Sequence, residues 1–501
     1  MLFLICYNTF INFYKRRNIM ENSQTPKKIS KLDSFFGITK SGSNIKTEII
    51  AGLTTFMAMV YILMVNAGIF SDASAVAGIS YSGMYIATAI GAIVGTLLIA
   101  LVAKMPLAQA SGMGINAFLV YSLILGNTGL TYANCMLFTL IEGIIFILLS
   151  VTGARKKIFE AIPAAVRKAI GVGIGLFIAF IGFQQAGFIV DESATLVTLV
   201  SFNVLGSASF ASAIPAVVAI LGVLLIAILS KKNVKGAILW GLLGAAVLYY
   251  VLYGIGALVG NAEAKAMFAA ITFSNPFDAF GAWGKESFGK VFTEGWKFSS
   301  FTGNTGGLVL IIITTALSLC MIDIFDTIGT LYGACSKGGL LDEKGVPLNM
   351  NKCMLSDAVA TCAGAIAGTS TVTTFVESSS GVAAGGKTGM TALVTGACFI
   401  IAMFLSPIAQ LIPRCATASA LVWVGVLMMS GVKDIDWSDS AEAVVAFITF
   451  IIMCLGYSIN KGIGYGIIAY VIVSIFTGKI KEISIPTWIL AVVYLATFML
   501  T

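Results

Sequence analysis

The chain has 501 residues, of which 58% are hydrophobic and 11% are charged, with a formal net charge of +7 and no histidine. Soluble proteins carry about 25% charged residues, so this composition excludes a soluble globule and indicates a polytopic α-helical membrane protein. A nucleic-acid partner is not indicated either, because the basic residues stand in short runs between apolar segments, as orientation in a lipid bilayer requires.

Residues 1–47 are expected to form a cytoplasmic N-terminal tail. Residues 1–19 hold a short apolar run that is followed by Lys15, Arg16 and Arg17. A secretory signal has the opposite order, with its positive charges before the apolar part. Residues 1–19 are therefore interpreted as an extension upstream of the true start site or as a weakly amphipathic tail.

Apolar segments that are long enough to cross a bilayer as helices follow along the rest of the chain. About fourteen spans are predicted, at residues 48–70, 83–104, 107–126, 131–153, 162–183, 212–230, 234–257, 306–334, 354–368, 369–387, 389–411, 416–431, 441–458 and 461–477. The apolar stretch 484–500 either spans the membrane or lies at its interface. The loops after spans four, six and eight are basic, which predicts a cell-membrane protein with a cytoplasmic N-terminus.

Short sequence echoes occur in the same order in both halves of the chain. "ATAIGAIVGT" (87–96) is similar to "ATCAGAIAGT" (360–369), and "GNTGLT" (126–131) is similar to "GKTGMT" (386–391). An Ile-Pro pair at 162–163 recurs at 412–413, and "KGAILWGLL" (235–243) is echoed by "KGIGYGIIA" (461–469). Each half of the chain holds seven of the predicted spans. Because seven is an odd number, the second half must enter the membrane from the opposite side, as in the inverted repeats of many secondary transporters.

Two spans in matching places of the halves are interrupted by Gly, Ser and Thr. They are "MPLAQASGMGINAF" (105–118) and "GTSTVTTFVESSSG" (368–381). Irregular backbone is tolerated at membrane depth only where it lines a cavity or is buried in protein. A short extended segment followed by a half-helix is expected in each, with the substrate site between them.

Three acids stand in or beside these interrupted spans: Asp323 and Asp326 in span eight, and Glu377 in span ten. A spacing of three places the two aspartates on neighbouring ridges of one helix. An ionisable group at this depth costs at least about 2.5–3.5 kcal/mol, so such groups usually face a cavity. One acid is expected to exchange a proton while another stays ionised and binds a ligand. The structural alternative is that an acid caps a broken helix or pairs with a buried lysine.

Two uncharged side chains are weaker candidates. Asn116 could offer its amide to a ligand or simply cap a helix, and Phe375 could stack on a flat ligand or simply pack. Glu142 and Asp357 are expected to be structural or to lie near the water boundary. The nine cysteines form no C-x-x-C pair and histidine is absent, so neither a metal site nor a cofactor is expected.

The segments "KTEIIAGLTTFMAMVYILMVNAGIF", "MPLAQASGMGINAF", "DIFDTIGTLYG" and "GTSTVTTFVESSSGVAAGGKTGMTALVTG" are similar to the nucleobase–cation symporter-2 family. They resemble its AzgA-like branch, the adenine/guanine/hypoxanthine permeases, over about residues 46–478. One departure is Ser111, where the branch often has proline. "SSSGVAAGGK" stands where the uracil/xanthine branch carries an Asn-x-Gly…Thr-Arg signature, which argues against uracil or xanthine as the main substrate.

The resemblance implies an all-α membrane fold of two inverted seven-span repeats, with short strands in spans 3 and 10, and with core and gate domains. The implied core comprises residues 48–153 and 306–411, and the implied gate comprises 154–257 and 412–478. Residues 258–305 would be an extracytoplasmic loop and 479–501 a C-terminal apolar segment. A homodimer is also consistent with the resemblance.

The resemblance also implies purine nucleobase import by proton symport with alternating access, in preference to sodium coupling. The substrate-binding residues would be Asp323, Glu377, Asn116, Asp326 and Phe375, with Asp326, Glu377 and Asp323 as candidates for proton coupling. An anion transporter or exchanger of the same general fold is the alternative function. An intramembrane aspartyl protease is disfavoured, because its two acids must face each other from separate helices whereas Asp323 and Asp326 share one.

Overall fold

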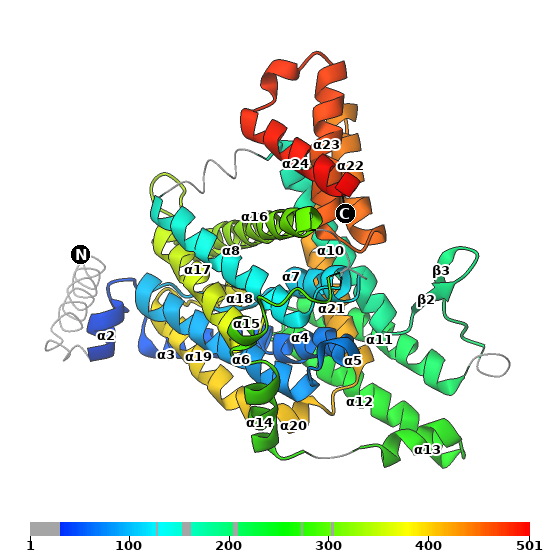
Figure 1. The fold of residues 1–501 in the computed structure, drawn as a ribbon. Coiled ribbons are helices and arrows are strands. Elements are labelled where there is room, and N and C mark those ends of the chain that lie inside the picture. The colour runs from blue at the N-terminus through cyan, green and yellow to red at the C-terminus, as the bar shows by residue number, and fades with distance from the viewer. Residues whose placement is uncertain are drawn as a thin grey trace, which may run out of the picture.

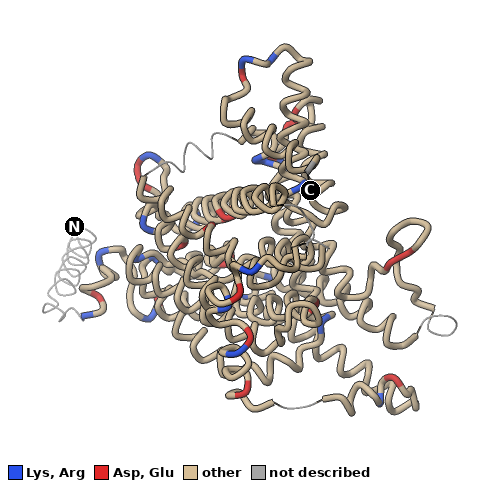
Figure 2. Tube along the Cα trace, in the orientation of Figure 1, with Lys and Arg blue, Asp and Glu red and all other residues tan. Residues whose placement is uncertain are grey.

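The computed structural model describes residues 31–126, 129–152, 162–203, 209–271, 274–301 and 305–500. The expectation for residues 1–19 lies outside these ranges. Within them, nine helices are long and apolar enough to cross a membrane, and shorter apolar helices add to these. Figure 2 shows that most of the helical body is uncharged, whereas the charged residues gather largely at loops and helix ends.

The first repeat contains all seven predicted spans, and span three is broken into a strand and a half-helix. Its elements are α3 (Ile45–Met59), α4 (Tyr61–Ser71), α6 (Tyr81–Leu98) with the π-helix η1 (Ile99–Ala103), β1 (Gln109–Ser111), α7 (Met113–Ala117) with the π-helix η2 (Phe118–Ile124), α8 (Tyr132–Thr152), α10 (Ala164–Gln185), α11 (Phe210–Lys231) and α12 (Ala237–Leu258).

The second repeat follows the same plan, with span ten broken in the same way. Its elements are α16 (Thr305–Gly338), α17 (Met350–Ala367), β4 (Val372–Thr374), α18 (Ser378–Ala383), α19 (Gly389–Met403), α21 (Arg414–Met428) with the 3₁₀-helix η3 (Met429–Asp434), α22 (Ser440–Leu455) and α23 (Ile459–Phe476). The repeated Ile-Pro pair marks equivalent places, since α10 begins directly after Pro163 and α21 directly after Pro413. The predicted fold class, with short strands in spans 3 and 10, is confirmed.

Shorter elements connect or flank the spans. They are α2 (Lys31–Phe36), α5 (Ser74–Ala77), the hairpin β2 (Ile189–Glu192) and β3 (Leu196–Leu199), α13 (Ala262–Ala269), α14 (Pro276–Glu286), α15 (Lys290–Thr293), α20 (Ser406–Ala409), the 3₁₀-helix η4 (Ile480–Glu482) and α24 (Ile485–Leu500). The described residues of segment 258–305, which was expected to be a loop, therefore include the helices α13, α14 and α15, of which α14 packs on α6 and α15 packs on α8. The C-terminal apolar stretch is a helix that packs on α23 and α16.

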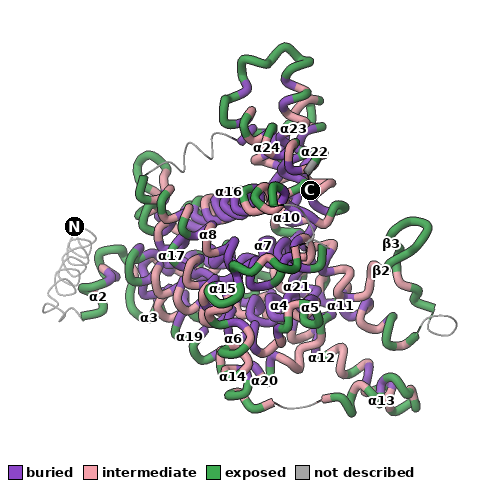
Figure 3. Tube along the Cα trace, viewed as in Figure 1, coloured by how far each residue is buried: buried purple, intermediate pink, exposed green. Residues whose placement is uncertain are grey.

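The helices pack in two groups, each built from both halves of the chain. In one group α3 packs on α19, while α6 packs on α17, α19 and α4. In the other group α10 packs on α21 and α22, and α11 packs on α12 and α21. Figure 1 shows this interleaving, with blue α3 and α6 beside yellow-green α17 and yellow α19, and the red helices α23 and α24 at the top. Figure 3 shows the buried residues concentrated where the two groups meet.

The strands β1 and β4 pair with each other in the middle of the protein. The pairing is antiparallel, with Gln109 opposite Thr374 and Ser111 opposite Val372. Two further backbone bonds extend it, from Gly112 N–H to the Thr371 carbonyl (2.9 Å) and from Phe375 N–H to the Ala108 carbonyl (3.0 Å). Equivalent segments of two oppositely inserted repeats run in opposite directions, so antiparallel pairing is what the inversion requires.

The contact between α10 and α21 depends on two glycines. A Cβ added to Gly175 would lie 2.7 Å from Met428 Cβ and 2.9 Å from the Gly425 carbonyl oxygen. Small residues let two membrane helices approach closely, and here the approach fixes the positions of the side chains that α10 and α21 direct toward the other helix group.

Replacing Gly175 with alanine is therefore expected to destabilise the fold by about 1–3 kcal/mol, the usual cost of inserting a methyl group into a packed interface. Gly171, on the same helix, has nothing within 4 Å of an added Cβ and supplies the matched control. Thermal unfolding of both variants in detergent is the measurement. Equal midpoints for Gly175→Ala and Gly171→Ala would show that this close approach does not matter.

Candidate functional site

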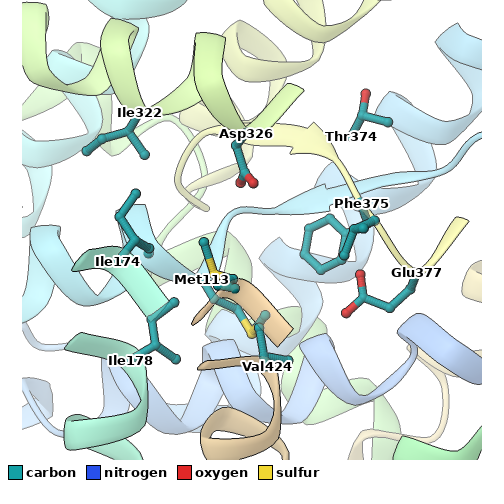
Figure 4. Close-up of a pocket in the computed structure, with 12 residues that line it drawn as sticks. Met113, Ile174, Ile178, Ile322, Asp326, Thr374, Phe375, Glu377 and Val424 are labelled. Atoms are coloured by element: carbon teal, nitrogen blue, oxygen red, sulfur yellow. The ribbon is translucent and has the colours of Figure 1, made fainter. Parts of the chain in front are cut away.

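A small cavity lies where the two helix groups meet beside the paired strands (Figure 4). Its volume is about 60 Å³. One wall comes from α10 and α21, which contribute apolar side chains. The opposite wall comes from α7, α16 and the segment around β4. The described lining residues are Met113, Gly114, Ile174, Ile178, Ile322, Asp326, Thr374, Phe375, Val376, Glu377, Val424 and Met428.

Two carboxylates, Asp326 and Glu377, point into this cavity from different elements (Figure 4). Asp326 lies within α16, and Glu377 lies between β4 and α18. The ring of Phe375 lies beside them, and its own position is fixed by the backbone bond to Ala108. None of the described lining residues is lysine or arginine. The cavity therefore offers hydrogen-bond acceptors within apolar walls.

Glu377 is held from a third element. The hydroxyl of Tyr61, the first residue of α4, donates a hydrogen bond to Glu377 Oε1 at 2.6 Å. Glu377 Oε2 is buried and has no hydrogen-bond partner among the described residues. One oxygen of this carboxylate is thus engaged by the protein, and the other is left to accept a hydrogen bond.

Asp323 and Asn116 are buried outside the lining of this cavity. Asp323 Oδ1 lies 3.5 Å from the hydroxyl of Thr327, one turn further along α16. Asn116 Oδ1 accepts hydrogen bonds from the hydroxyls of Ser111 and Ser370, which lie in the two interrupted spans. Asn116 Nδ2 has no hydrogen-bond partner among the described residues. The structure therefore brings together Asp326, Phe375 and Glu377 but not all five predicted residues.

Further polar side chains support the strands from behind. Asp357 on α17 accepts a hydrogen bond from Gln109 Nε2 at 2.8 Å, and its other oxygen lies 2.8 Å from the Thr327 hydroxyl. Glu142 on α8 accepts one from Thr371 at 2.6 Å. These contacts satisfy polar groups that would otherwise be costly to bury. Both acids are fully buried, so neither lies at the water boundary, the other place that the sequence allowed for them.

A second polar cluster joins the two helix groups near the end of α4. Asp72 pairs with Arg414 at the start of α21 and accepts hydrogen bonds from Tyr121 on η2 and from Gln185 at the end of α10. Side chains from α21, η2 and α10 thus converge on the one carboxylate that follows α4. Sequence reasoning missed this cluster, because each residue stands at a span end where charged and polar residues are ordinary.

Sequence reasoning also missed Tyr61. It is a single tyrosine in an apolar run, and its partner Glu377 lies 316 positions away in the chain. A tyrosine in a membrane helix usually signals packing or an interface position. Only the contact itself distinguishes Tyr61 from the other tyrosines of the chain.

Two interleaved helix groups, broken spans that meet at mid-protein and an apolar-walled cavity with two carboxylates between the groups define a membrane transporter with a core and a gate. The chain belongs to the nucleobase–cation symporter-2 family, because the family model described as "Permease family" (Xan_ur_permease) matches residues 46–465. A guanine/hypoxanthine permease of Bacillus subtilis, PbuO, is 37% identical, with 89% of this chain and 96% of that protein covered. An adenine permease of Escherichia coli, AdeP, is 34% identical, with 93% and 95% covered.

Solved structures share the fold at low sequence identity. The transmembrane domain of the cyanobacterial bicarbonate transporter BicA superposes with a TM-score of 0.54 at 14% identity, covering 83% of this chain and 96% of that one. The structure of SLC26A9 gives a TM-score of 0.56 at 12% identity, covering 89% and 68%. Identities this low establish the common architecture alone.

Removing the Asp357 carboxylate would take away the acidic acceptor that the buried Gln109 amide and Thr327 hydroxyl share. Asp357→Ala is therefore expected to lower the free energy of unfolding by about 2–3 kcal/mol, as loss of a charged acceptor from buried donors does. The melting midpoint of the purified protein measures this. Asp278→Ala, at an exposed position on α14, serves as the control and should leave the midpoint unchanged.

Proposed function

We propose that this protein is a secondary active transporter that imports purine nucleobases, namely adenine, guanine and hypoxanthine, by proton symport. The observation that carries the proposal is the pair of carboxylates, Asp326 and Glu377, that face one apolar-walled cavity beside Phe375 (Figure 4). The names of the relatives, which include adenine and guanine/hypoxanthine permeases, support the choice of purines.

The chemistry of a purine base suits such a cavity. The base is flat and uncharged, and its edges carry N–H donors and ring-nitrogen acceptors. Asp326 and Glu377 would accept hydrogen bonds from the N–H groups, and Phe375 would lie against the ring face. The wall formed by Ile174, Ile178 and Val424 favours an apolar ring over a hydrated ion.

Asp323 and Asn116 would act from behind the cavity wall in this proposal. Asn116 ties the two interrupted spans together through Ser111 and Ser370 and keeps a free amide N–H₂. Asp323 would support the α16 segment that presents Asp326. A ligand that reached deeper than the cavity would meet both residues.

Proton coupling follows from the two facing acids. Two carboxylates at one small cavity repel each other, and a bound proton removes that repulsion before a neutral base enters. Asp326 and Glu377 are the principal candidates to carry the proton, and Asp323 is the third. A sodium site needs several oxygen ligands around one point, and the mainly apolar lining of this cavity does not offer that arrangement.

Alternating access fits the size of the cavity. Its volume of about 60 Å³ is well below the roughly 300 Å³ at which small-molecule pockets begin, so a bicyclic base needs the two walls to separate. In this proposal the core, residues 48–153 and 306–411, moves against the gate, residues 154–257 and 412–478. The N-terminus would be cytoplasmic, in agreement with the basic loops.

An anion transporter remains the second candidate, since the fold neighbours include a bicarbonate transporter. The sign of the charge decides against it: a cavity lined by two carboxylates repels an anion. A transported anion would require a cationic or neutral site, whereas none of the described lining residues is lysine or arginine.

Neutralising either cavity acid should strongly reduce purine uptake. Asp326→Asn and Glu377→Gln are each expected to lower the uptake efficiency, kcat/KM, by about tenfold or more, because each removes a charged acceptor from the site. Radiolabelled adenine, guanine and hypoxanthine supplied to cells that lack their own purine permeases provide the measurement. Asp278→Asn, which is exposed and distant in the chain, is the control.

The variant Asp323→Asn distinguishes the residues that line the cavity from those that lie behind its wall. It should reduce protein stability more than it changes the KM for any base, because Asp323 does not line the cavity. Undiminished purine uptake by the Asp326→Asn, Glu377→Gln double variant would contradict the proposal. Bicarbonate or sulfate uptake by the wild type, without purine uptake, would favour the second candidate instead.

The coupling ion can be tested separately. A protonophore is expected to remove at least about 90% of concentrative hypoxanthine uptake, whereas replacement of sodium by choline should leave it unchanged, because only the proton gradient drives transport in this proposal. Initial rates in proteoliposomes with imposed ion gradients provide the measurement. Uptake that follows the sodium gradient would overturn proton symport while leaving the purine assignment intact.

A further inference from the structure

The two oxygens of the Glu377 carboxylate differ in their surroundings. Oε1 accepts a hydrogen bond from the Tyr61 hydroxyl at 2.6 Å, whereas Oε2 is buried without a hydrogen-bond partner among the described residues. An ionised carboxylate accepts hydrogen bonds but cannot donate them. The cavity-facing residue therefore has one acceptor oxygen already engaged and one oxygen still available.

Tyr61 is well placed to hold this arrangement. It is the first residue of α4, directly after Val60, which separates α3 from α4, and its side chain is fully buried. A buried phenol needs a hydrogen-bond partner, and many tyrosines find one on a backbone carbonyl. Tyr85 does so, because its hydroxyl donates to the Ala402 carbonyl at 2.9 Å. Tyr61 instead donates its single hydroxyl hydrogen to Glu377, the acid that lines the cavity.

Few other side chains around Glu377 could donate a hydrogen bond to its carboxylate. Asp326 on α16 and Tyr61 on α4 are the titratable side chains of the described residues that face Glu377. The helices α7, α10 and α21 contribute Met113, Ile174, Ile178, Val424 and Met428, which cannot donate a hydrogen bond to a carboxylate.

We propose that Tyr61 is a positioning residue that engages Oε1 of Glu377 and presents Oε2 alone to the substrate, so that Glu377 accepts a single N–H from the bound base. The proposal rests on the purine site argued above and adds to it a determinant of selectivity. An ionised carboxylate with both oxygens available pairs best with two adjacent donors. With one lone pair of Oε1 occupied and the carboxylate held in place by Tyr61, a second adjacent donor on the base gains less from Glu377.

Guanine and hypoxanthine differ at the relevant edge. Guanine has a ring N–H next to an exocyclic NH₂ and thus two adjacent donors, whereas hypoxanthine has the ring N–H alone. Loss of the Tyr61 hydroxyl would free Oε1 to accept the second donor of guanine. It would also let the carboxylate rotate away from the ring N–H that hypoxanthine uses.

Tyr61→Phe should therefore change selectivity as well as affinity. We expect the KM for hypoxanthine to rise about tenfold, which corresponds to one charge-assisted hydrogen bond held less well, with kcat changed less than about twofold. The ratio of guanine to hypoxanthine uptake efficiency should rise at least about threefold. Both bases are measured by initial-rate uptake in proteoliposomes, and their binding to the purified full-length protein is measured by calorimetry.

Tyr85→Phe is the matched control, because it removes a buried tyrosine hydroxyl from a backbone partner away from the cavity. It should lower the melting midpoint without moving either KM or the base preference. If Tyr61 merely supported the fold, Tyr61→Phe would behave in the same way as Tyr85→Phe. An unchanged base preference in Tyr61→Phe would overturn the inference.

A second variant covers the case in which Tyr61→Phe cannot be purified. Glu377→Asp shortens the acid by one methylene and withdraws the carboxylate from the Tyr61 hydroxyl, while the tyrosine itself is kept. It should shift the base preference toward guanine in the same direction, and an unshifted preference would contradict the inference. A wild type that transports none of the three bases would instead refute the proposed function, so the two failures are distinguishable.

Discussion

The antiparallel pairing of β1 and β4 is the constraint on which the rest of the structure depends. A bilayer offers no water to satisfy a backbone N–H or carbonyl, so an extended segment at membrane depth survives only with a partner. Each broken span supplies the partner of the other, through the register that sets Gln109 opposite Thr374 and Ser111 opposite Val372. Neither half could hold its interrupted span alone, and the two repeats are therefore mutually dependent.

The same pairing accounts for the position of the cavity. Because β4 ends at Thr374, Phe375 and Glu377 leave the sheet where the helices α16 and α10 approach it. Asp357 and Glu142 satisfy the polar side chains on the other side of the strands, so the acids of this region divide into two sets. One set carries hydrogen bonds that hold the strands, and the other set faces the space between the helix groups.

The sequence predicted the architecture well because its signals are local or periodic. Apolar runs predicted the spans, the echoes predicted the inverted repeat, and clusters of Gly, Ser and Thr predicted both strands. The site was predicted less completely. A spacing of three restricts Asp323 and Asp326 to neighbouring ridges, but only the packing of α16 against β4 and α10 decides that Asp326 lines the cavity and Asp323 does not. The Tyr61 contact joins positions 316 residues apart and has no local signature.

Architecture shared with a bicarbonate transporter shows that this scaffold does not itself determine the ligand. What a paired-strand site recognises depends on the few side chains that leave the strands toward α10 and α21. In this chain those side chains are an aromatic ring and a carboxylate, met by a second carboxylate from α16. Carboxylates select for donors and against negative charge, and the apolar wall selects against hydration. The proposed ligand, a neutral planar base with N–H edges, meets these demands together, whereas an anion fails those on charge and hydration.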